Sequence, residues 1–194
     1  MKKKALIISL NGTKLSKMEK ILLSEEKPWG VILFKRNLKS RKQIKNLTMS
    51  IRNLTNDTKF PIIIDEEGEK VSRLRNIINH GISASFFGNL FKKNKDFCSK
   101  TYQEYIFSLS KILNELGINI NTIPVLDVIR KNTNKVIRNR SFSNDIKTVK
   151  QLGKLTLKYL HQKKIAGIIK HIPGHGAALV AVSYTHLTLP TSPK

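Results

Sequence analysis

The chain has one cysteine, few acidic residues and no long apolar run, and each shortage excludes a class of protein. Cys98 alone cannot form an internal disulfide, which excludes a disulfide-stabilised secreted domain and fits a reducing compartment. No apolar run approaches the length that crosses a bilayer. The basic start at 2–4 and the apolar stretch at 5–10 imitate a signal peptide, but the stretch stops at Asn11, short of a usual hydrophobic region. We therefore expect a soluble, cytoplasmic protein without a membrane partner.

Acidic residues number 13 against 36 lysines and arginines, so the formal net charge is +23. Such an excess is typical of nucleic-acid-binding proteins. Here, however, the lysines are spread along the whole chain and accompany many isoleucines and asparagines, three residue types that share A- and T-rich codons. The sequence contains no zinc-finger spacing, no RNP motif and no basic patch interleaved with aromatic residues. A biased genome explains this composition, and we expect no nucleic-acid partner.

Short apolar runs alternate with helical patterns along the 194 residues, a length that suits one domain. The run at 5–10 is expected to form a buried strand, and the run at 60–64 is apolar on both faces, as a parallel strand covered by helices must be. Residues 69–95 are expected to be irregular, with Gly81 and Gly88 as breakers. The remaining expected strands are 30–34, one within 118–128, and 165–169; the expected helices are 15–24, 40–55 capped by Ser40, 98–116 stopped by Gly117, and 144–162 capped by Asn144 or Asp145.

Polar residues follow several of these strands at the point where each strand ends. In a (β/α)8 barrel the active site lies at the carboxyl ends of the strands, so these side chains would face one mouth. An open doubly wound sheet would place its site similarly, but no G-x-G-x-x-G motif follows the first strand. The pattern favours an α/β fold of the (β/α)8 TIM-barrel type, incomplete, with about five β/α units present. The residues expected at the mouth are Arg36, Asp65, Asp127, Lys170 and His171.

The segment KHIPGHG at 170–176 brings two cation-capable side chains out of an apolar strand into a turn. Pro173 restricts φ and the two glycines permit positive φ, so the backbone can bend sharply there. Taken alone, this segment is more typical of an ordinary strand-to-helix loop with solvated basic residues than of an active site. Its interpretation depends on the other motifs of the chain.

Four motifs occur in the order seen in glycoside hydrolase family 3: IDEEGEKVSRL at 64–74, IPVLDV at 123–128, IRNRSF at 137–142 and KHIPGHG at 170–176. From about residue 5 to 176 the chain resembles the N-terminal domain of the short bacterial β-N-acetylhexosaminidases of this family, cytoplasmic enzymes that remove N-acetylglucosamine from peptidoglycan fragments. The resemblance implies a retaining hydrolase of terminal non-reducing N-acetylglucosamine, monomeric at full length, without cofactor or metal. The chain departs from the family where 68–70 reads Gly-Glu-Lys in place of Gly-Gly-Arg and where Arg138 replaces a glycine, so we expect those loops to differ.

The resemblance also implies a set of sugar contacts. Asp65 would accept hydrogen bonds from sugar hydroxyls, and Arg73, Arg140, Lys170 and His171 would contribute the remaining contacts. A carboxylate surrounded by charged donors makes stronger hydrogen bonds than neutral groups would. Asp65 could also be a helix cap or an ion-pair partner, although its place at a strand end favours sugar binding, and without the motifs the two arginines would be solvated surface charges.

Other polar residues near these motifs are expected to be structural. Glu66 and Glu67 are sequence neighbours whose side chains should diverge, so they do not form the opposed carboxylate pair of a glycosidase. Asp127 is expected to have a structural role. His175 is expected to hold its loop rather than to transfer protons.

A retaining glycosidase needs an acid/base and a nucleophile on opposite sides of the scissile bond. In the resembled enzymes a D-x-H motif after the PGHG turn supplies the acid/base, but the equivalent positions here hold Ala181 and Ser183, and His186 has no aspartate before it. The nucleophilic aspartate would lie beyond a later strand. We therefore predict that this chain contains no catalytic residue.

The composition changes at residue 177, where lysine gives way to leucine, threonine, serine and proline. We interpret 1–176 as the N-terminal part of the family barrel and 177–194 as a tail of artificial origin, foreign to the family. Two further functions stay open. One is a family 3 β-glucosidase, and the other is a non-catalytic fragment that binds a sugar or a polyanion.

Overall fold

The structure, a computed structural model, describes residues 3–78 and 80–177. Within these ranges five strands form one parallel sheet in which consecutive strands are neighbours. The predicted parallel α/β arrangement is therefore confirmed. The strands β1 and β5 each have a single neighbouring strand in the described part, so the sheet is open there. The strands are β1 (Lys4–Ser9), β2 (Pro28–Leu33), β3 (Ile62–Ile64), β4 (Ile120–Asn121) and β5 (Ala166–Gly167).

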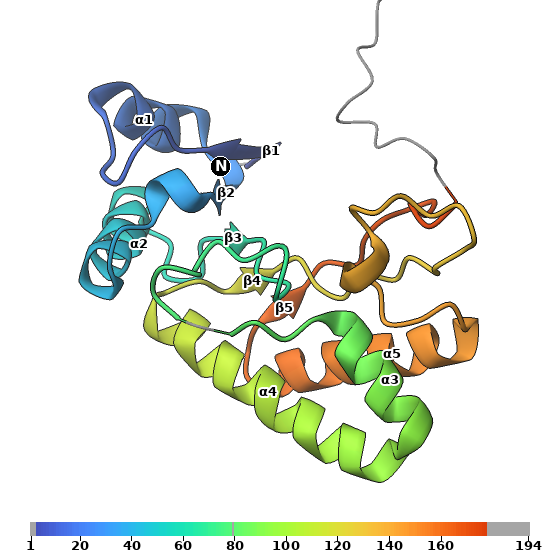
Figure 1. Ribbon diagram of the computed structural model, residues 1–194. Helices are drawn as coiled ribbons and strands as arrows, with labels where there is room; N and C mark the ends of the chain where they lie inside the picture. The colour runs from blue at the N-terminus through green and yellow to red at the C-terminus, as the bar shows by residue number, and fades with distance from the viewer. Residues whose placement is uncertain (1–2, 79, 178–194) are drawn as a thin grey trace, which may run out of the picture.

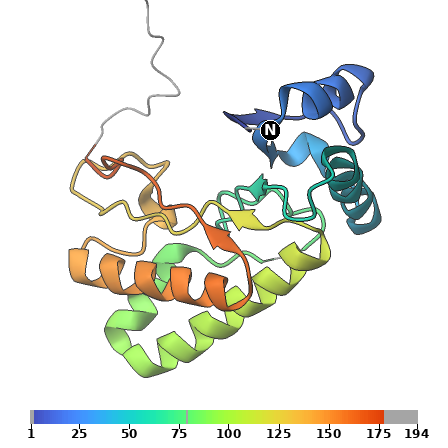
Figure 2. The ribbon, with the colours of Figure 1, turned by 180° about the vertical axis from the view of Figure 1, so that it is seen from behind.

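The helices cover the sheet in two groups. Figures 1 and 2 show α2 beside the β1–β2 end of the sheet, and α3, α4 and α5 packed together along β4 and β5. No helix in the described ranges is both long and apolar enough to cross a membrane. The helices are α1 (Lys17–Ile21), continued by a π-helical segment (Leu22–Glu26), α2 (Arg41–Thr55), α3 (Ala84–Lys93), α4 (Lys95–Glu115) and α5 (Ile146–Gln162), with 3₁₀ turns at Lys35–Asn37 and Arg138–Arg140.

Local capping determines where several helices begin and end. The Ser40 hydroxyl accepts the backbone N–H of Gln43 at 3.2 Å and starts α2, as predicted. Of the two caps considered for α5, Asp145 is correct, because its carboxylate accepts the first backbone N–H groups of the helix. Gly117 follows α4 with a φ of +74°, which is the conformation expected of a residue that stops a helix.

Two of the sequence-based expectations are wrong. The strand at 5–10 forms but is not buried: Leu6 and Ile7 are 53% and 51% exposed, because β1 lies at the open edge of the sheet. Residues 69–95 are not irregular throughout, since α3 begins at 84. Gly88 is not a breaker but a contact point in α3, where a Cβ atom would lie 1.6 Å from the carbonyl oxygen of Phe142.

The hydrophobic core lies between the sheet and helices α2 to α5. Strand β3 is buried on both faces, as its apolar composition predicts. Burying each large aliphatic side chain contributes about 1.5–3 kcal/mol, and this packing holds the strand ends in place. The fully buried members include Leu33, Ile44, Ile51, Ile62, Ile64, Ile106, Leu113 and Leu152.

The part of the chain assigned to an artificial tail lies, apart from Ala177, outside the described residues. The same holds for Ala181, Ser183 and His186, the residues at and near the expected D-x-H motif.

Candidate functional site

Asp65, directly after β3, is the centre of a cluster of charged side chains at the carboxyl ends of the strands. Its Oδ2 accepts a hydrogen bond from Arg73 Nη2 at 3.1 Å. Its Oδ1 accepts from Thr122 Oγ1 at 2.5 Å and from Lys170 Nζ at 3.2 Å. These partners follow β3, β4 and β5, so the parallel sheet brings together residues up to 105 positions apart. We call Asp65, Glu67, Arg73, Arg140 and Lys170 the strand-end cluster.

The environment of Asp65 keeps its carboxyl group ionised. Burial alone would raise its pKa, but the charge of Lys170 and the hydrogen bonds from Thr122, Arg73 and Lys170 outweigh burial and lower the pKa from 3.8 to about 2. Three donors occupy three of about four acceptor positions on the carboxylate. Because the side chain is still 19% exposed, Asp65 can accept one further hydrogen bond from a ligand.

Glu67 joins two of the predicted site residues beneath Asp65. Arg140 donates to its carboxylate from Nε at 2.7 Å and from Nη2 at 2.9 Å, and Lys170 Nζ lies 2.5 Å from Oε1. Burial by itself would lower the pKa of Arg140, but the Glu67 carboxylate raises it, so the guanidinium stays charged. The structural role expected for Glu67 stays a prediction, and the sequence did not indicate that Glu67 pairs with two site residues. The Arg140 side chain is therefore more buried than that of Arg73, and its main partner is Glu67.

Asp127 orients His171 through a buried contact. Its Oδ2 lies 2.6 Å from His171 Nδ1, and its Oδ1 accepts the backbone N–H of His175 at 2.5 Å. Burial would raise the pKa of Asp127, but the hydrogen bonds from His171 and from the His175 amide lower it. Since Nδ1 is engaged, Nε2 is the ring nitrogen that His171 can offer to a ligand. The structural role expected for Asp127 stays a prediction, which these buried contacts support.

Glu66 points away from the strand-end cluster and is fully buried. It accepts the backbone N–H groups of Arg73 and Leu74, while Glu67 faces Arg140 and Lys170. The prediction that the two neighbouring glutamates diverge is therefore confirmed. The arrangement has two layers: Asp65, Arg73, Lys170 and His171 are partly exposed, and the buried carboxylates Glu66, Glu67 and Asp127 support them.

Arg36, expected at the same mouth, does not join the strand-end cluster. Its Nε donates to the carbonyl oxygen of Leu10 at 2.8 Å. Its guanidinium carbon lies 4.9 Å from the centre of the Phe34 ring, and that of Arg73 lies 5.7 Å from the same ring. Arg36 therefore borders the cluster through this aromatic ring rather than through a carboxylate.

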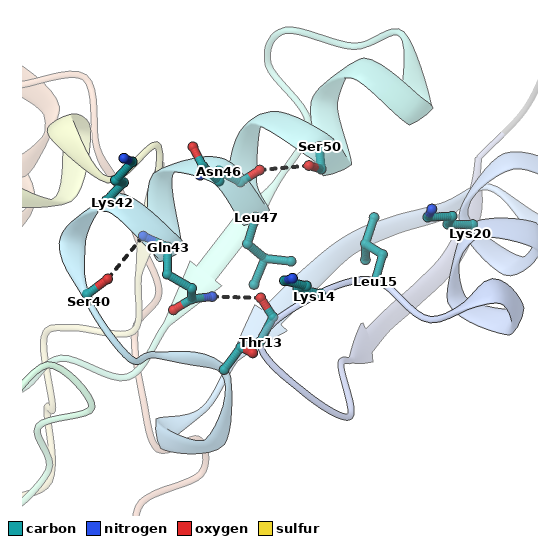
Figure 3. A pocket seen from close by; sticks show the side chains of 10 residues that line it. All are labelled: Thr13, Lys14, Leu15, Lys20, Ser40, Lys42, Gln43, Asn46, Leu47 and Ser50. Carbon is teal, nitrogen blue, oxygen red and sulfur yellow. Dashed lines mark hydrogen bonds between the residues drawn. The ribbon is translucent and has the colours of Figure 1, made fainter.

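A separate cavity of about 510 Å³ lies between the segment after β1 and helix α2 (Figure 3). Figure 3 shows Gln43 reaching across it to the carbonyl oxygen of Thr13, at 2.7 Å. The residues that line this cavity include no member of the strand-end cluster. Three of them are lysines, and none is acidic. In the described residues no group of three or more histidine, cysteine, aspartate or glutamate side chains is placed to hold a metal ion.

Comparisons with known proteins agree with the motifs. The model of the glycosyl hydrolase family 3 N-terminal domain matches residues 2–194. A beta-hexosaminidase of Xanthomonas campestris pv. campestris (strain B100) is 29% identical over 185 residues, which cover 95% of this chain and 55% of that protein. The chain thus spans about half the length of the curated relatives it matches.

Solved structures show the same likeness. NagZ from Neisseria gonorrhoeae, in complex with N-trifluoroacetyl-D-glucosamine, superposes with a TM-score of 0.80 at 28% identity, covering 90% of this chain and 51% of that one. A glycoside hydrolase family 3 beta-N-acetylglucosaminidase from Paenibacillus sp. str. FPU-7 superposes with a TM-score of 0.78 at 26% identity, covering 91% and 33%. The TIM-barrel-like α/β fold is thereby confirmed, and within residues 3–78 and 80–177 it comprises five parallel strands that do not close into a barrel.

Proposed function

The chain belongs to glycosyl hydrolase family 3, and from this we propose that Asp65, Arg73, Arg140, Lys170 and His171 bind the terminal N-acetylglucosamine residue of a peptidoglycan fragment. The whole protein would hydrolyse that residue as a retaining, cytoplasmic β-N-acetylhexosaminidase. The observation that carries the proposal is the Asp65 carboxylate, which is held ionised by three donors and still partly exposed at a family motif.

The arrangement of the partly exposed side chains supports the proposed contacts. Asp65 accepts from sugar hydroxyls, and Arg73, Lys170 and His171 donate to hydroxyl oxygens. A hydrogen bond to a charged group contributes about 1.5–3 kcal/mol, so losing one should weaken binding about tenfold or more. The remaining guanidinium N–H groups of Arg140 can support the same ligand from below.

The charge balance of the site supports a neutral ligand over a polyanion. The three cations Arg73, Arg140 and Lys170 are paired with Asp65 and Glu67 rather than left unpartnered. A sugar hydroxyl can donate a hydrogen bond to a carboxylate and accept one from a cation, whereas a polyanion would be repelled by the carboxylates. The ligand named for the gonococcal NagZ structure, N-trifluoroacetyl-D-glucosamine, is of the proposed chemical class.

The chain is proposed to supply sugar binding without the catalytic pair. The positions expected to hold the acid/base motif contain Ala181 and Ser183, neither of which can serve as a general acid. An assay of the hydrolysis of an aryl N-acetylglucosaminide tests whether the chain lacks catalytic activity. We expect no measurable release of the aryl group by the chain, and a turnover like that of a full-length relative would overturn the claim.

Sugar binding is tested by titrating N-acetylglucosamine into the chain while following amide signals by NMR. We expect saturable shifts near Asp65 and Lys170, and affinity at least about tenfold weaker in Asp65→Asn. The matched control is Glu104→Gln, which neutralises an exposed carboxyl on α4 and should bind like the wild type. Equal affinity in wild type and Asp65→Asn would refute the assignment.

Two further titrations separate the alternatives. Preference for glucose over N-acetylglucosamine would favour a family 3 β-glucosidase. Binding of a polyanion that weakens steeply with salt, without sugar binding, would favour the polyanion-binding alternative, because ionic contacts are screened and neutral-sugar contacts are not.

A further inference from the structure

A buried group of contacts lies behind Arg73 and takes no part in the proposed sugar contacts. The Oε2 of Glu66 accepts the backbone N–H groups of Arg73 and Leu74, each at 2.8 Å. Its Oε1 lies 2.5 Å from Nε2 of His80. The backbone of Glu66 is held by Asn121, which accepts its N–H at 3.0 Å and donates to its carbonyl at 2.8 Å. Glu66 therefore ties the end of β3 to the turn that carries Arg73.

His80 connects this carboxylate to helix α4. Its Nδ1 lies 3.1 Å from the Tyr105 hydroxyl, and its side chain is only 14% exposed. Burial, with a further contribution from the Glu66 charge, raises the pKa of Tyr105, so the phenol keeps its proton. A neutral imidazole can thus accept from Tyr105 and donate from Nε2 to Glu66. The contacts run without a break from Tyr105 through His80 and Glu66 to the turn at 73–74.

The position of the Arg73 backbone determines where its guanidinium reaches. The turn is tight, because Glu67 and Gly68 both donate to the carbonyl oxygen of Val71. Beyond that turn, the Arg73 guanidinium contacts Asp65 and the Phe34 ring, and its buried Nε has no hydrogen-bond partner among the described residues. The Arg73 side chain itself therefore has few contacts, whereas its backbone N–H is anchored by Glu66.

We propose that Glu66 and His80 are positioning residues that hold Arg73 against Asp65 in the geometry that binds the sugar. The inference rests on the proposed sugar-binding function and extends it to residues with no sugar contact of their own. The motif contains Glu66, but His80 lies outside all four motifs. A buried carboxylate that accepts two peptide N–H groups needs a further donor to offset its desolvation, and His80 provides one.

The test compares N-acetylglucosamine affinity, by NMR titration, in the full chain and in variants of the two residues. We expect Glu66→Ala to weaken binding at least about tenfold and His80→Ala to weaken it about threefold to tenfold. Glu66→Gln should restore affinity to within about threefold of wild type, because an amide oxygen can accept the two backbone N–H groups, and its NH2 can donate to Nε2 of His80 when the imidazole takes the tautomer whose Nδ1 donates to the Tyr105 hydroxyl. Glu104→Gln is again the control.

A double-mutant cycle separates positioning from loss of structure. If Glu66 acts through Arg73, then Glu66→Ala should cause no further loss of affinity in an Arg73→Ala background. A general loss of structure would weaken both backgrounds by the same factor, and that result would overturn the inference. Wild-type affinity in His80→Ala would also overturn it, whether or not Glu66→Ala folds.

The same titrations distinguish a failure of the sugar-binding function from a failure of the positioning role. If the wild-type chain does not bind N-acetylglucosamine, the proposed function fails and the positioning role falls with it. If the wild type binds, Asp65→Asn does not, and the Glu66 and His80 variants bind normally, only the positioning role is refuted.

Discussion

Replacing Asp65 with asparagine should destabilise the folded chain more at neutral pH than in acid. In the native protein the pKa of this carboxyl is lowered from 3.8 to about 2, with Lys170 as the main source of the lowering. A group whose folded-state pKa lies below its unfolded-state pKa stabilises the fold above the unfolded value. That stabilisation is lost as the pH falls from about 4 towards 2. Asparagine keeps the size of the side chain, removes its charge, and replaces one of the two acceptor oxygens with an NH2 donor.

The size of the effect follows from the difference between the two pKa values. A fall from 3.8 to about 2 corresponds to about 2 kcal/mol of unfolding free energy at pH 7. At pH 3 the unfolded-state carboxyl is mostly protonated and the native one mostly ionised, so about 1 kcal/mol remains. Because the Asp65 side chain is only 19% exposed, solvent screens its ion pairs less than it would screen a surface pair.

Urea unfolding at pH 7 and pH 3, followed by circular dichroism, measures this difference without adding salt. The gap in unfolding free energy between wild type and Asp65→Asn should be about 1 kcal/mol smaller at pH 3 than at pH 7, because only the part of the gap that comes from the charge depends on pH. Glu104→Gln, a neutralised carboxyl on the exposed face of α4, should differ from wild type by less than about 0.5 kcal/mol at both. A gap for Asp65→Asn that is equal at pH 7 and pH 3, or absent at both, would show that its partners do not lower the pKa.

Three other experiments test the packing of the core. Gly88→Ala should cost about 3 kcal/mol or more in thermal or urea unfolding, because the new Cβ would lie 1.6 Å from the Phe142 carbonyl oxygen, whereas Gly12→Ala, with open space around it, should be near neutral. Cys98 should react with a disulfide reagent far more slowly in the native chain than in urea, since the thiol is fully buried and burial raises its pKa to about 11; equal rates would contradict the packing around it. Tyr102→Phe should cost about 1 kcal/mol in unfolding, because the hydroxyl shares a 2.7 Å hydrogen bond with a buried threonine; an unchanged stability would mean that this bond contributes nothing net.

The secondary structure was largely predictable because its signals are local. The strand at 60–64 and the helix at 40–55 follow from apolar spacing over a few residues, and the cap at Ser40 acts within a single turn. Helix α3 was missed because Gly88 interrupts its pattern. The reason for that glycine, the close approach of the 142 carbonyl, lies 54 residues further along the chain and has no local signal.

The burial of β1 was misjudged for a related reason. Its apolar residues indicate a strand but do not say how many neighbours the strand has. In the described sheet β1 has one neighbouring strand, so Leu6 and Ile7 stay exposed although their composition suits a core. Apolar composition predicts the capacity for burial, and only the tertiary arrangement decides whether it is used.

The candidate site divides in the same way between sequence and structure. The motifs, together with the rule that parallel strands present their carboxyl ends at one edge, were enough to expect Asp65, Arg73 and Lys170 in one place. The sequence could not show that Glu67 is shared by Arg140 and Lys170, or that Glu66 and His80 anchor the turn that carries Arg73. These pairs join loops that follow different strands or lie far apart along one loop, and their distances depend on how the backbone folds back in space. The sequence by itself determined which charged groups exist and which strands deliver them, because those are properties of neighbouring residues. Only the tertiary structure decided which acid holds which base, because a contact between distant residues is set by the packing of the elements that carry them.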